Sequence, residues 1–225
     1  MATRGATTSE SEAVFQGRRE EKKALSRRRI LDAAREVFFR DGFMAANLDE
    51  VAEGAGVAKG TLYRYFETKG ELYVAVLADN GAIFERKMRA TLDPALDARD
   101  QLRRTARFYF DHYVDNRAYF QIFWAIENQS VIGQLPAGVV DEVARLWESC
   151  VSLVAGVVRQ GVSSGHFVPC DAWEVAHVLW TVANGLIQTE ISAARRRLRR
   201  RRLDEAFDDA VEIVLRGIAA DRGGA

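Results

Sequence analysis

The sequence contains few residues that interrupt or cross-link a chain. Its 225 residues include three prolines (Pro94, Pro136 and Pro169) and two cysteines, so long stretches are free to form helices. Cys150 and Cys170 lie among apolar residues and form no short-spaced pair, so we expect buried, reduced thiols. Lysine plus arginine balance aspartate plus glutamate at 32 each. With no net charge, the chain would have to meet a polyanion through a local basic patch.

Long hydrophobic runs are also absent. No stretch approaches the roughly 18 apolar residues of a membrane span, and the amino end, MATRGATTSESEAVFQG, has no apolar segment typical of a signal peptide. We therefore expect a cytoplasmic protein. GVSSG, residues 161–165, formally matches the G-x-S-x-G of hydrolases, but no strand pattern precedes it. Because no metal, P-loop or dinucleotide motif occurs either, we expect a protein that is not an enzyme and needs no cofactor.

Apolar residues recur three and four positions apart along most of the chain. The series Ile30, Ala33, Val37 and Phe38 is typical of a helix face packed on a core. The alternation of period two that marks strands is rare. The sequence therefore predicts an all-α protein with about nine helices. The expected ranges are 22–41, 47–54, 58–64, 68–91, 95–115, 118–128, 136–161, 171–197 and 203–220.

Residues 47–69 have the features of two short helices joined by a tight turn. Asn47 can cap the first helix, Gly54 ends it, and Gly56 can take the positive φ that closes the turn. A second short helix then begins near Ala58. Such a pair forms a helix-turn-helix, whose second helix enters the major groove of DNA. The alternative is a loop between two core helices with incidental polar residues.

Polar groups on the second short helix and a basic segment upstream are candidates for DNA contacts. Charged, hydroxyl and phenolic side chains can bind the DNA backbone, and a glycine permits close approach. In the upstream segment Lys22, Lys23, Arg27 and Arg28 can meet phosphates, and Arg18 and Arg19 can form a flexible arm in the minor groove. A solvated helix face is the alternative for that segment. The candidate DNA-binding residues are Arg27, Arg28, Asn47, Lys59, Gly60, Thr61, Tyr63, Tyr65 and Lys69.

The segment Arg28–Tyr73 resembles the amino-terminal domain of the TetR family of bacterial transcription regulators. The resemblance rests on the spaced motifs IL-AA---F---GF and L--VA--AGV-KGTLY-YF--K-EL. Asn47 stands where the family more often has threonine, and both residues cap helices. The resemblance implies a homodimer that reads a palindromic operator in double-stranded DNA. It also implies a three-helix DNA-binding domain at 18–67 and a larger effector-binding and dimerisation domain at 68–225. Residues 1–17 are polar and small, so their composition predicts a disordered tail.

The last two expected helices carry more apolar residues than one packing surface needs. A helix that is apolar on two sides packs on its own domain and on a second surface, so we expect these helices to pair with their copies in a homodimer. Two-fold symmetry would then present two recognition helices about 34–36 Å apart. The candidate interface residues are Val175, Val178, Leu179, Val182, Leu186, Phe207, Val211, Val214, Leu215 and Ile218.

Aromatic residues concentrate between residues 108 and 124. They are typical of a plain core or of the lining of an apolar effector cavity, and the pattern leaves both open. The candidate lining residues are Tyr113, Phe120, Trp124, Trp147, Trp180, Asn184 and Gln188. We expect a repressor that a small apolar or aromatic effector releases from its operator. The alternative function is an all-helical ligand-binding or scaffold protein without DNA activity.

The run RRRLRRRR, Arg195–Arg202, is the strongest charge bias in the expected folded part. Cations are favoured at the carboxyl end of a helix, so we expect the run to close a long helix. Acidic residues downstream can offset the repulsion among the arginines; these are Asp204, Glu205, Asp208 and Asp209. The alternative is a second site for a polyanion.

Overall fold

The computed structural model describes residues 6–117, 119–120, 124, 137–190 and 193–220. Within these ranges the secondary structure consists of nine helices and one isolated bridge between Phe167 and Ala219, so the all-α prediction is confirmed. None of the described helices is long and apolar enough to cross a membrane. The expected helix at 118–128 lies largely outside the described residues.

The chain divides into two compact units. The first comprises residues 1–78 and 121–140, and the second comprises residues 79–120 and 141–225. The boundary therefore falls inside a helix rather than near residue 67. Tyr73 explains the difference, because its fully buried ring packs edge-on against Phe38, with ring centroids 5.0 Å apart, and thereby belongs to the core of the first unit.

Three helices and the start of a fourth form the first unit. They are α1 (Ala6–Ala45), α2 (Leu48–Gly54), α3 (Lys59–Tyr65) and the beginning of α4 (Lys69–Arg89). α1 changes direction at Gly42, whose φ of 74° is left-handed. Ile30, Val51 and Leu62, from α1, α2 and α3, are fully buried, so each short helix is held by one apolar face on a common core.

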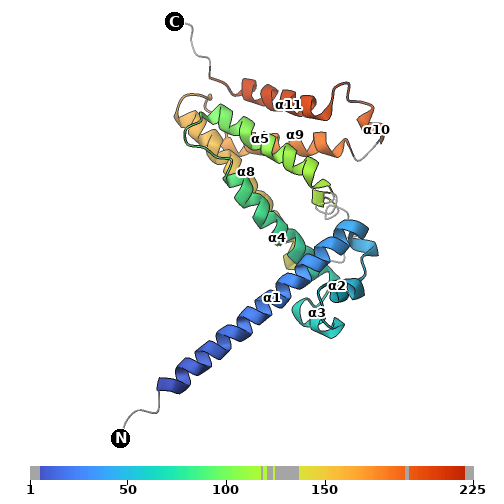
Figure 1. Ribbon diagram of the computed structural model, residues 1–225. Helices are drawn as coiled ribbons and strands as arrows, with labels where there is room; N and C mark the ends of the chain where they lie inside the picture. Colours follow the sequence, from blue (N-terminus) through green and yellow to red (C-terminus); the bar gives the residue numbers. More distant parts are fainter. Residues whose placement is uncertain (1–5, 118, 121–123, 125–136, 191–192, 221–225) are drawn as a thin grey trace. The chain divides into compact units, whose positions relative to one another are not determined.

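α1 extends much further toward the amino terminus than the sequence predicted. In place of a disordered tail over residues 1–17, residues 6–17 belong to this helix, which is 40 residues long (Figure 1). The segment contains Ala, Glu and Gln residues, which favour helix, and it has no proline before the basic segment. The cations of that segment therefore stand on a helix rather than on a flexible arm.

Helices α5 (Ala98–Asp115), α8 (Ala137–Ser163), α9 (Ala172–Gln188) and α11 (Leu203–Gly217), with the end of α4, build the second unit. Asp97 and Asp171 cap α5 and α9 by accepting hydrogen bonds from backbone N–H groups of the first turn. α11 packs along both α9 and α5 (Figure 1). Across the α5–α11 contact, the guanidinium of Arg103 donates to both carboxylate oxygens of Glu212, at 2.5 and 3.0 Å.

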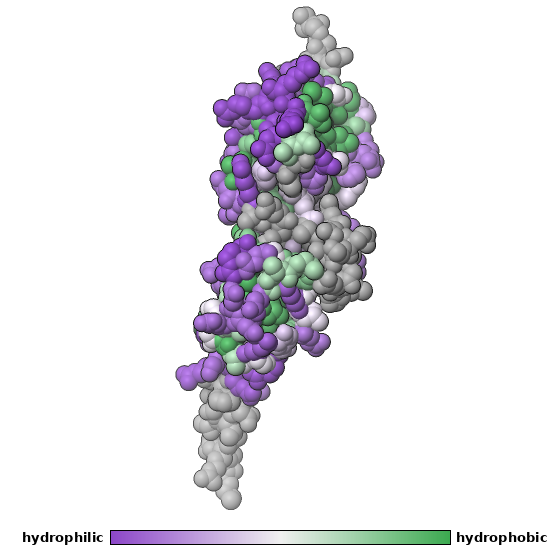
Figure 2. Space-filling view, turned by 90° about the vertical axis from the view of Figure 1, so that its right-hand side faces the viewer, coloured by the Kyte–Doolittle hydropathy of each residue, from purple (hydrophilic) through white to green (hydrophobic). Residues whose placement is uncertain are grey.

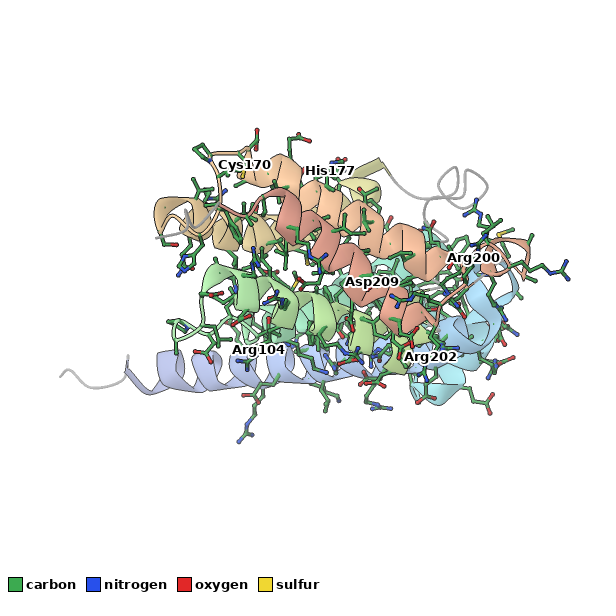
Figure 3. The ribbon with its side chains drawn as sticks, turned by 90° about the horizontal axis from the view of Figure 1, so that it is seen from above. Arg104, Cys170, His177, Arg200, Arg202 and Asp209 are labelled. Carbon is green, nitrogen blue, oxygen red and sulfur yellow. The ribbon has the colours of Figure 1, made fainter. Side chains whose placement is uncertain are left out.

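The arginine run does not close a long helix. α9 ends at Gln188, α10 (Ala193–Arg196) is a single turn, and the following residues lead into α11 without helical structure. Figure 3 shows Arg200 and Arg202 beside the start of α11, which carries Asp209. The predicted acidic offset is confirmed in part by two ion pairs, Arg201 with Asp209 and Arg202 with Asp204. Seven like charges disfavour one continuous helix, and the ion pairs stabilise a bend instead.

Candidate functional sites

The turn between α2 and α3 has the predicted geometry. The side chain of Asn47 accepts a hydrogen bond from the backbone N–H of Asp49 at 2.9 Å and caps α2. Gly56 has a φ of 62°, and its N–H donates to the carbonyl of Glu53 at 2.9 Å. The helix-turn-helix prediction is confirmed at this level, because cap, glycine turn and second helix all lie where the sequence indicated.

One residue that fixes this turn was missed by sequence reasoning. Arg29 of α1 donates from its guanidinium to the carbonyl oxygens of Ala55 and of Gly56, the latter 3.2 Å away. The last carbonyls of a short helix have no partner within it, so a side chain that binds them completes the helix end. In the sequence Arg29 is one of several cations in a row, and nothing local distinguishes it.

α3 exposes a polar face. Lys59, Gly60, Tyr63 and Arg64 are exposed, Thr61 and Tyr65 are half-buried, and Leu62 points into the core. Arg64 was not among the predicted contacts; its guanidinium donates to the hydroxyl of Thr61 at 3.2 Å. A cation, a hydroxyl and two phenols on one short helix suit contacts with a DNA strand.

Lys59 is not a free cation in this structure. Its ammonium lies 2.7 Å from a carboxylate oxygen of Asp49 at the start of α2, and that hydrogen bond raises the pKa of Lys59. Both side chains are more than half exposed, so the pair is open to water. A DNA phosphate would compete with Asp49 for this lysine.

The predicted phosphate contact of Lys69 is not supported by its surroundings. Its ammonium donates to the backbone carbonyl of Met44 at 3.0 Å and lies 5.3 Å from the centroid of the Phe43 ring. Partial burial lowers the pKa of Lys69. The side chain thus joins the start of α4 to the end of α1, and a DNA phosphate would have to compete with these contacts for the ammonium.

Arg27 and Arg28 also make contacts within the first unit. The guanidinium of Arg27 lies 5.3 Å from the centroid of the Phe66 ring, and that of Arg28 lies 3.4 Å from a carboxylate oxygen of Asp32 one turn along α1. Arg28 and Asp32 are about half exposed. Such a surface pair is weak enough for a phosphate to replace the carboxylate.

An apolar cavity of about 50 Å³ lies within the second unit. Met88 of α4 and residues of α5, α8, α9 and α11 surround it, and nearly all of the lining atoms are apolar. Both hydroxyls of the lining are already paired: the hydroxyl of Thr105 lies 3.0 Å from that of Thr91, and the Tyr109 hydroxyl donates to the side-chain oxygen Oδ1 of Asn184 at 2.7 Å. A molecule in this cavity would meet hydrocarbon surface and few free polar partners.

Only one of the seven predicted pocket residues, Trp180, lines this cavity. Asn184 stands behind the lining, bound to Tyr109. Tyr113 and Phe120 are buried against each other, with ring centroids 5.4 Å apart. Trp124, Trp147 and Gln188 are half-buried and do not line it. The residues that do line it and were missed are Met88, Leu102, Thr105, Ala106, Tyr109, Val151, Val154, Ala176, Leu179, Ala183, Phe207 and Val211.

Several predicted dimer residues lie inside the chain. Phe207, Leu215 and Ile218 are buried in the second unit, and Val211 and Leu179 line its cavity. Phe207, Val211 and Leu215 face their own chain, because α11 packs its main apolar stripe on α5 and α9, whereas Leu179 of α9 is half-buried. Val178 is exposed, while Val175, Val182, Leu186 and Val214 are half-buried. Two large apolar residues are also exposed: Trp173 of α9, which belongs to the second apolar stripe of that helix, and Ile213 of α11, which the sequence did not single out.

The GVSSG match lies where a hydrolase nucleophile would not be placed. Ser163 is the last residue of α8, and Gly165, with a φ of 72°, turns the chain after it. Ser164, which follows, hydrogen-bonds to the ring of His166 at 2.7 Å and to the carbonyl of Gln160. The segment ends a helix, as predicted, and no strand leads into it.

Comparison with known proteins assigns the family. The model for "Bacterial regulatory proteins, tetR family" matches residues 30–76. The chain is similar to the HTH-type transcriptional activator FasR of Mycolicibacterium smegmatis (strain ATCC 700084 / mc(2)155), with 31% identity over 197 residues that cover 86% of this chain and 83% of FasR. The chain belongs to the TetR family. It is therefore a DNA-binding transcription regulator with a ligand-binding domain, rather than an enzyme.

Two further similarities are to a curated protein and to a solved structure from Bacillus subtilis. The fatty acid metabolism regulator protein of Bacillus subtilis (strain 168) is 23% identical over 60% of this chain and 68% of that protein. The crystal structure of the transcriptional regulator FadR from Bacillus subtilis in complex with stearoyl-CoA superposes with a TM-score of 0.66 at 19% identity, covering 84% of this chain and 98% of FadR. At that identity the second similarity shows a shared fold.

Proposed function

We propose that this TetR-family regulator binds a palindromic operator as a homodimer in the cytoplasm, and that an apolar effector in the second unit releases it. On this proposal the chain is a repressor. One observation carries the effector part: the cavity lining is almost entirely apolar, and its two hydroxyls, those of Thr105 and Tyr109, are already hydrogen-bonded within the chain. The exposed polar face of α3 supports the DNA part.

The size of the cavity supports a switch. Its volume of about 50 Å³ is well below the roughly 300–1,000 Å³ of ordinary ligand pockets, so an effector has to widen it. Widening separates helices that now touch, such as α5 and α11 at Phe110 and Phe207, whose ring centroids are 5.0 Å apart. A ligand that binds only the widened arrangement shifts the population toward it.

A long hydrocarbon chain is the effector class that we propose. Such a chain fills a narrow apolar space and needs no hydrogen-bond partners there, because it carries no polar groups. The relatives support this class, because one is named as a regulator of fatty acid metabolism and another was crystallised with stearoyl-CoA. Fatty acyl-CoA esters of different chain length are therefore the first compounds to test.

Exposed apolar residues on α9 and α11 support a homodimer. Trp173, Val178 and Ile213 are 41, 45 and 69% exposed. Hydrophobic side chains also gather in one area of the second unit on the face seen in Figure 2. A two-fold axis allows the same patch to cover itself, so a closed dimer would remove these side chains from water. The proposed interface thus uses the outer sides of these helices rather than buried residues such as Leu215.

Three measurements test the proposal. Gel shifts with the DNA upstream of the chain's own gene, at several salt concentrations, should show sequence preference and a steep salt dependence. Sedimentation should give a dimer. Addition of an acyl-CoA that binds the protein should weaken DNA binding, and a ligand that binds tightly while DNA affinity stays unchanged contradicts the switch. Absence of any DNA binding would favour a helical ligand-binding protein without DNA activity.

Activation is a second candidate, favoured by the name of the relative FasR, a transcriptional activator. A reporter assay distinguishes repression from activation. Deletion of the gene should raise the activity of the promoter that carries the operator if the chain represses, and lower it if the chain activates.

A further inference from the structure

The inward side of α1 changes character toward the amino terminus. Residues Arg19, Lys23, Ser26 and Ile30 follow one another at steps of three and four, so they lie on one side of the helix. Ile30 is fully buried, Ser26 is half-buried, and Arg19 and Lys23 are exposed. The side of α1 that packs on the core of the first unit is therefore apolar at Ile30. Further toward the amino terminus, beyond that core, the same side carries two cations.

Arg19 and Lys23 line a groove on the surface of the first unit. With Glu20 they line an open groove of about 400 Å³, whose other side is formed by Arg64 and Tyr65 at the carboxyl end of α3. Figure 1 shows how α1 runs past α3 on its way to the amino terminus. Two helices that are far apart in sequence thus contribute three cations, one phenol and a single carboxylate to the same groove.

The cations in the groove lack carboxylate partners. Among the residues that the structure describes, neither Arg19 nor Lys23 forms an ion pair, and the hydrogen bond recorded for Arg64 goes to the hydroxyl of Thr61. Some cations elsewhere on this unit do form ion pairs, as Lys59 does with Asp49 and Arg28 with Asp32. Like charges that share a groove repel each other, so an anion with several oxygens would stabilise the arrangement.

We propose that this groove binds a phosphate of the DNA backbone beside the bases that α3 contacts. The occupant follows from the position of Arg64 and Tyr65, which belong to α3 and continue the helix beyond Lys59 and Thr61. Five residues of helix separate Lys59 from Arg64, about 7.5 Å along the axis. A duplex carries a negative charge every ~1.7 Å of its axis, so a backbone phosphate lies within reach when α3 is in the major groove.

The helical form of the segment matters for this role. A flexible arm has to become ordered on binding, which costs conformational entropy, whereas Arg19 and Lys23 already stand on a continuous helix that the core holds from Ile30 onward. The inference rests on operator binding as proposed above and adds a second contact region, formed by α1 and the carboxyl end of α3.

The test compares three variants on the upstream DNA fragment that the wild-type chain binds. The double variant Arg19→Ala/Lys23→Ala should bind DNA about ten-fold or more weakly at 0.1 M salt. The slope of log affinity against log salt concentration should decrease by the equivalent of about one to two phosphate contacts. The matched control Arg18→Ala/Lys22→Ala removes the same charge from the same turns, on another side of α1, and should lose several-fold less. Glu20→Gln removes the carboxylate from the groove and should tighten binding.

Hydroxyl-radical footprints give a readout that depends on position. The wild type should protect backbone positions next to each half-site that the Arg19→Ala/Lys23→Ala variant leaves open, while protection at the half-sites persists. If both double variants lose the same DNA affinity and both keep the wild-type footprint, the proposed phosphate site in the groove is wrong. The cations of α1 would then attract DNA only through their general charge. Failure of the wild type to bind any upstream DNA would count against operator and groove together. Helical content from circular dichroism checks that the alanines leave α1 folded.

Discussion

Arg29 of α1 holds the turn of the helix-turn-helix, because its guanidinium donates to the carbonyl oxygen of Gly56 at 3.2 Å. The same nitrogen donates to the carbonyl of Ala55, the residue that ends α2. The long helix α1 therefore binds the loop that sets the direction of α3. A side chain that never touches DNA can in this way position the residues that do.

Replacement of Arg29 by alanine should destabilise the first unit and weaken DNA binding together. Two carbonyls lose a charged donor, so we expect a loss of about 1–3 kcal/mol in the free energy of unfolding. Denaturant unfolding and gel shifts measure the two effects. Arg28→Ala is the control for stability. Its ion pair with Asp32 is about half exposed, so we expect the free energy of unfolding to change by less than about 1 kcal/mol. Equal destabilisation by both variants would contradict the role of Arg29.

Two glycines of the helix-turn-helix should respond to alanine in opposite ways. Gly56 has a φ of 62°, and a Cβ there would overlap the guanidinium of Arg29, so Gly56→Ala should cost about 1–2 kcal/mol of stability or more. At Gly60, in α3, a Cβ meets nothing within 4 Å. Gly60→Ala should therefore leave stability unchanged or raise it by up to about 1 kcal/mol, while the added methyl group weakens DNA binding. Thermal unfolding and gel shifts separate the two outcomes.

The local parts of the DNA-binding unit could be predicted from the sequence. Asn47, Gly56 and Leu62 have the cap, the positive φ and the burial that their residue types indicated. The cap and the turn depend on neighbours within a few residues, and the burial of Leu62 follows from the apolar periodicity of its helix, so the sequence displays all three directly. Lys69 could not be predicted in this way, because its partner Met44 lies 25 positions away and is reached only after α1 bends.

The second unit was predicted less well, for the same physical reason. The apolar stripe of α11 was recognised, but periodicity does not say whether Phe207 and Leu215 face their own chain or a second copy. Both are buried within the chain. The cavity also depends on how five helices meet, and small residues such as Ala106 and Ala183 line it without any distinctive sequence pattern.

Asp49 should restrain DNA binding through its ion pair with Lys59. Asp49→Asn keeps the size of the side chain, removes a negative charge and releases the ammonium for a phosphate. We expect several-fold tighter DNA binding at low salt, and a difference that shrinks as salt rises, because screening weakens the contacts of exposed charges. Salt titrations of the two proteins measure this. In the reference variant Lys59→Ala, the same change at Asp49 should have less effect; an equal gain there would show that the lysine is not involved.

His112 should make the stability of the second unit depend on pH. Its ring packs on Phe84, with centroids 5.0 Å apart, and burial in this cluster lowers its pKa below 6.5; Lys87 adds to this shift and Asp115 opposes it. The unfolded chain therefore binds the proton more readily. The stabilising contribution is complete above about pH 6.5 and is lost as the pH falls through the lower pKa of the folded state.

Unfolding free energies at pH 7.5 and 5.5 test this effect. The decrease between the two values should be smaller in His112→Phe than in the wild type, because phenylalanine keeps the ring contacts and cannot bind a proton. The paired carboxylates of Asp97 and Glu212 have lowered pKa values and stay ionised over this range, so they do not contribute. An unchanged difference in the variant would remove His112 as the source.

A side chain that fills the cavity should separate effector binding from DNA binding. Ala183 of α9 lines the cavity, and a methionine there can follow the shape of the empty space because its side chain is flexible. The larger side chain fills a cavity of only about 50 Å³, so the substitution should cost about 1–3 kcal/mol of stability and leave the chain folded. The effector should bind at least about ten-fold more weakly to Ala183→Met, while DNA affinity without effector stays the same. The variant should therefore remain on the operator at effector concentrations that release the wild type.

Ser152→Met, at an exposed position of α8, is the matched control and should respond to the effector normally. Release of both variants at the same effector concentration would place the effector outside this cavity.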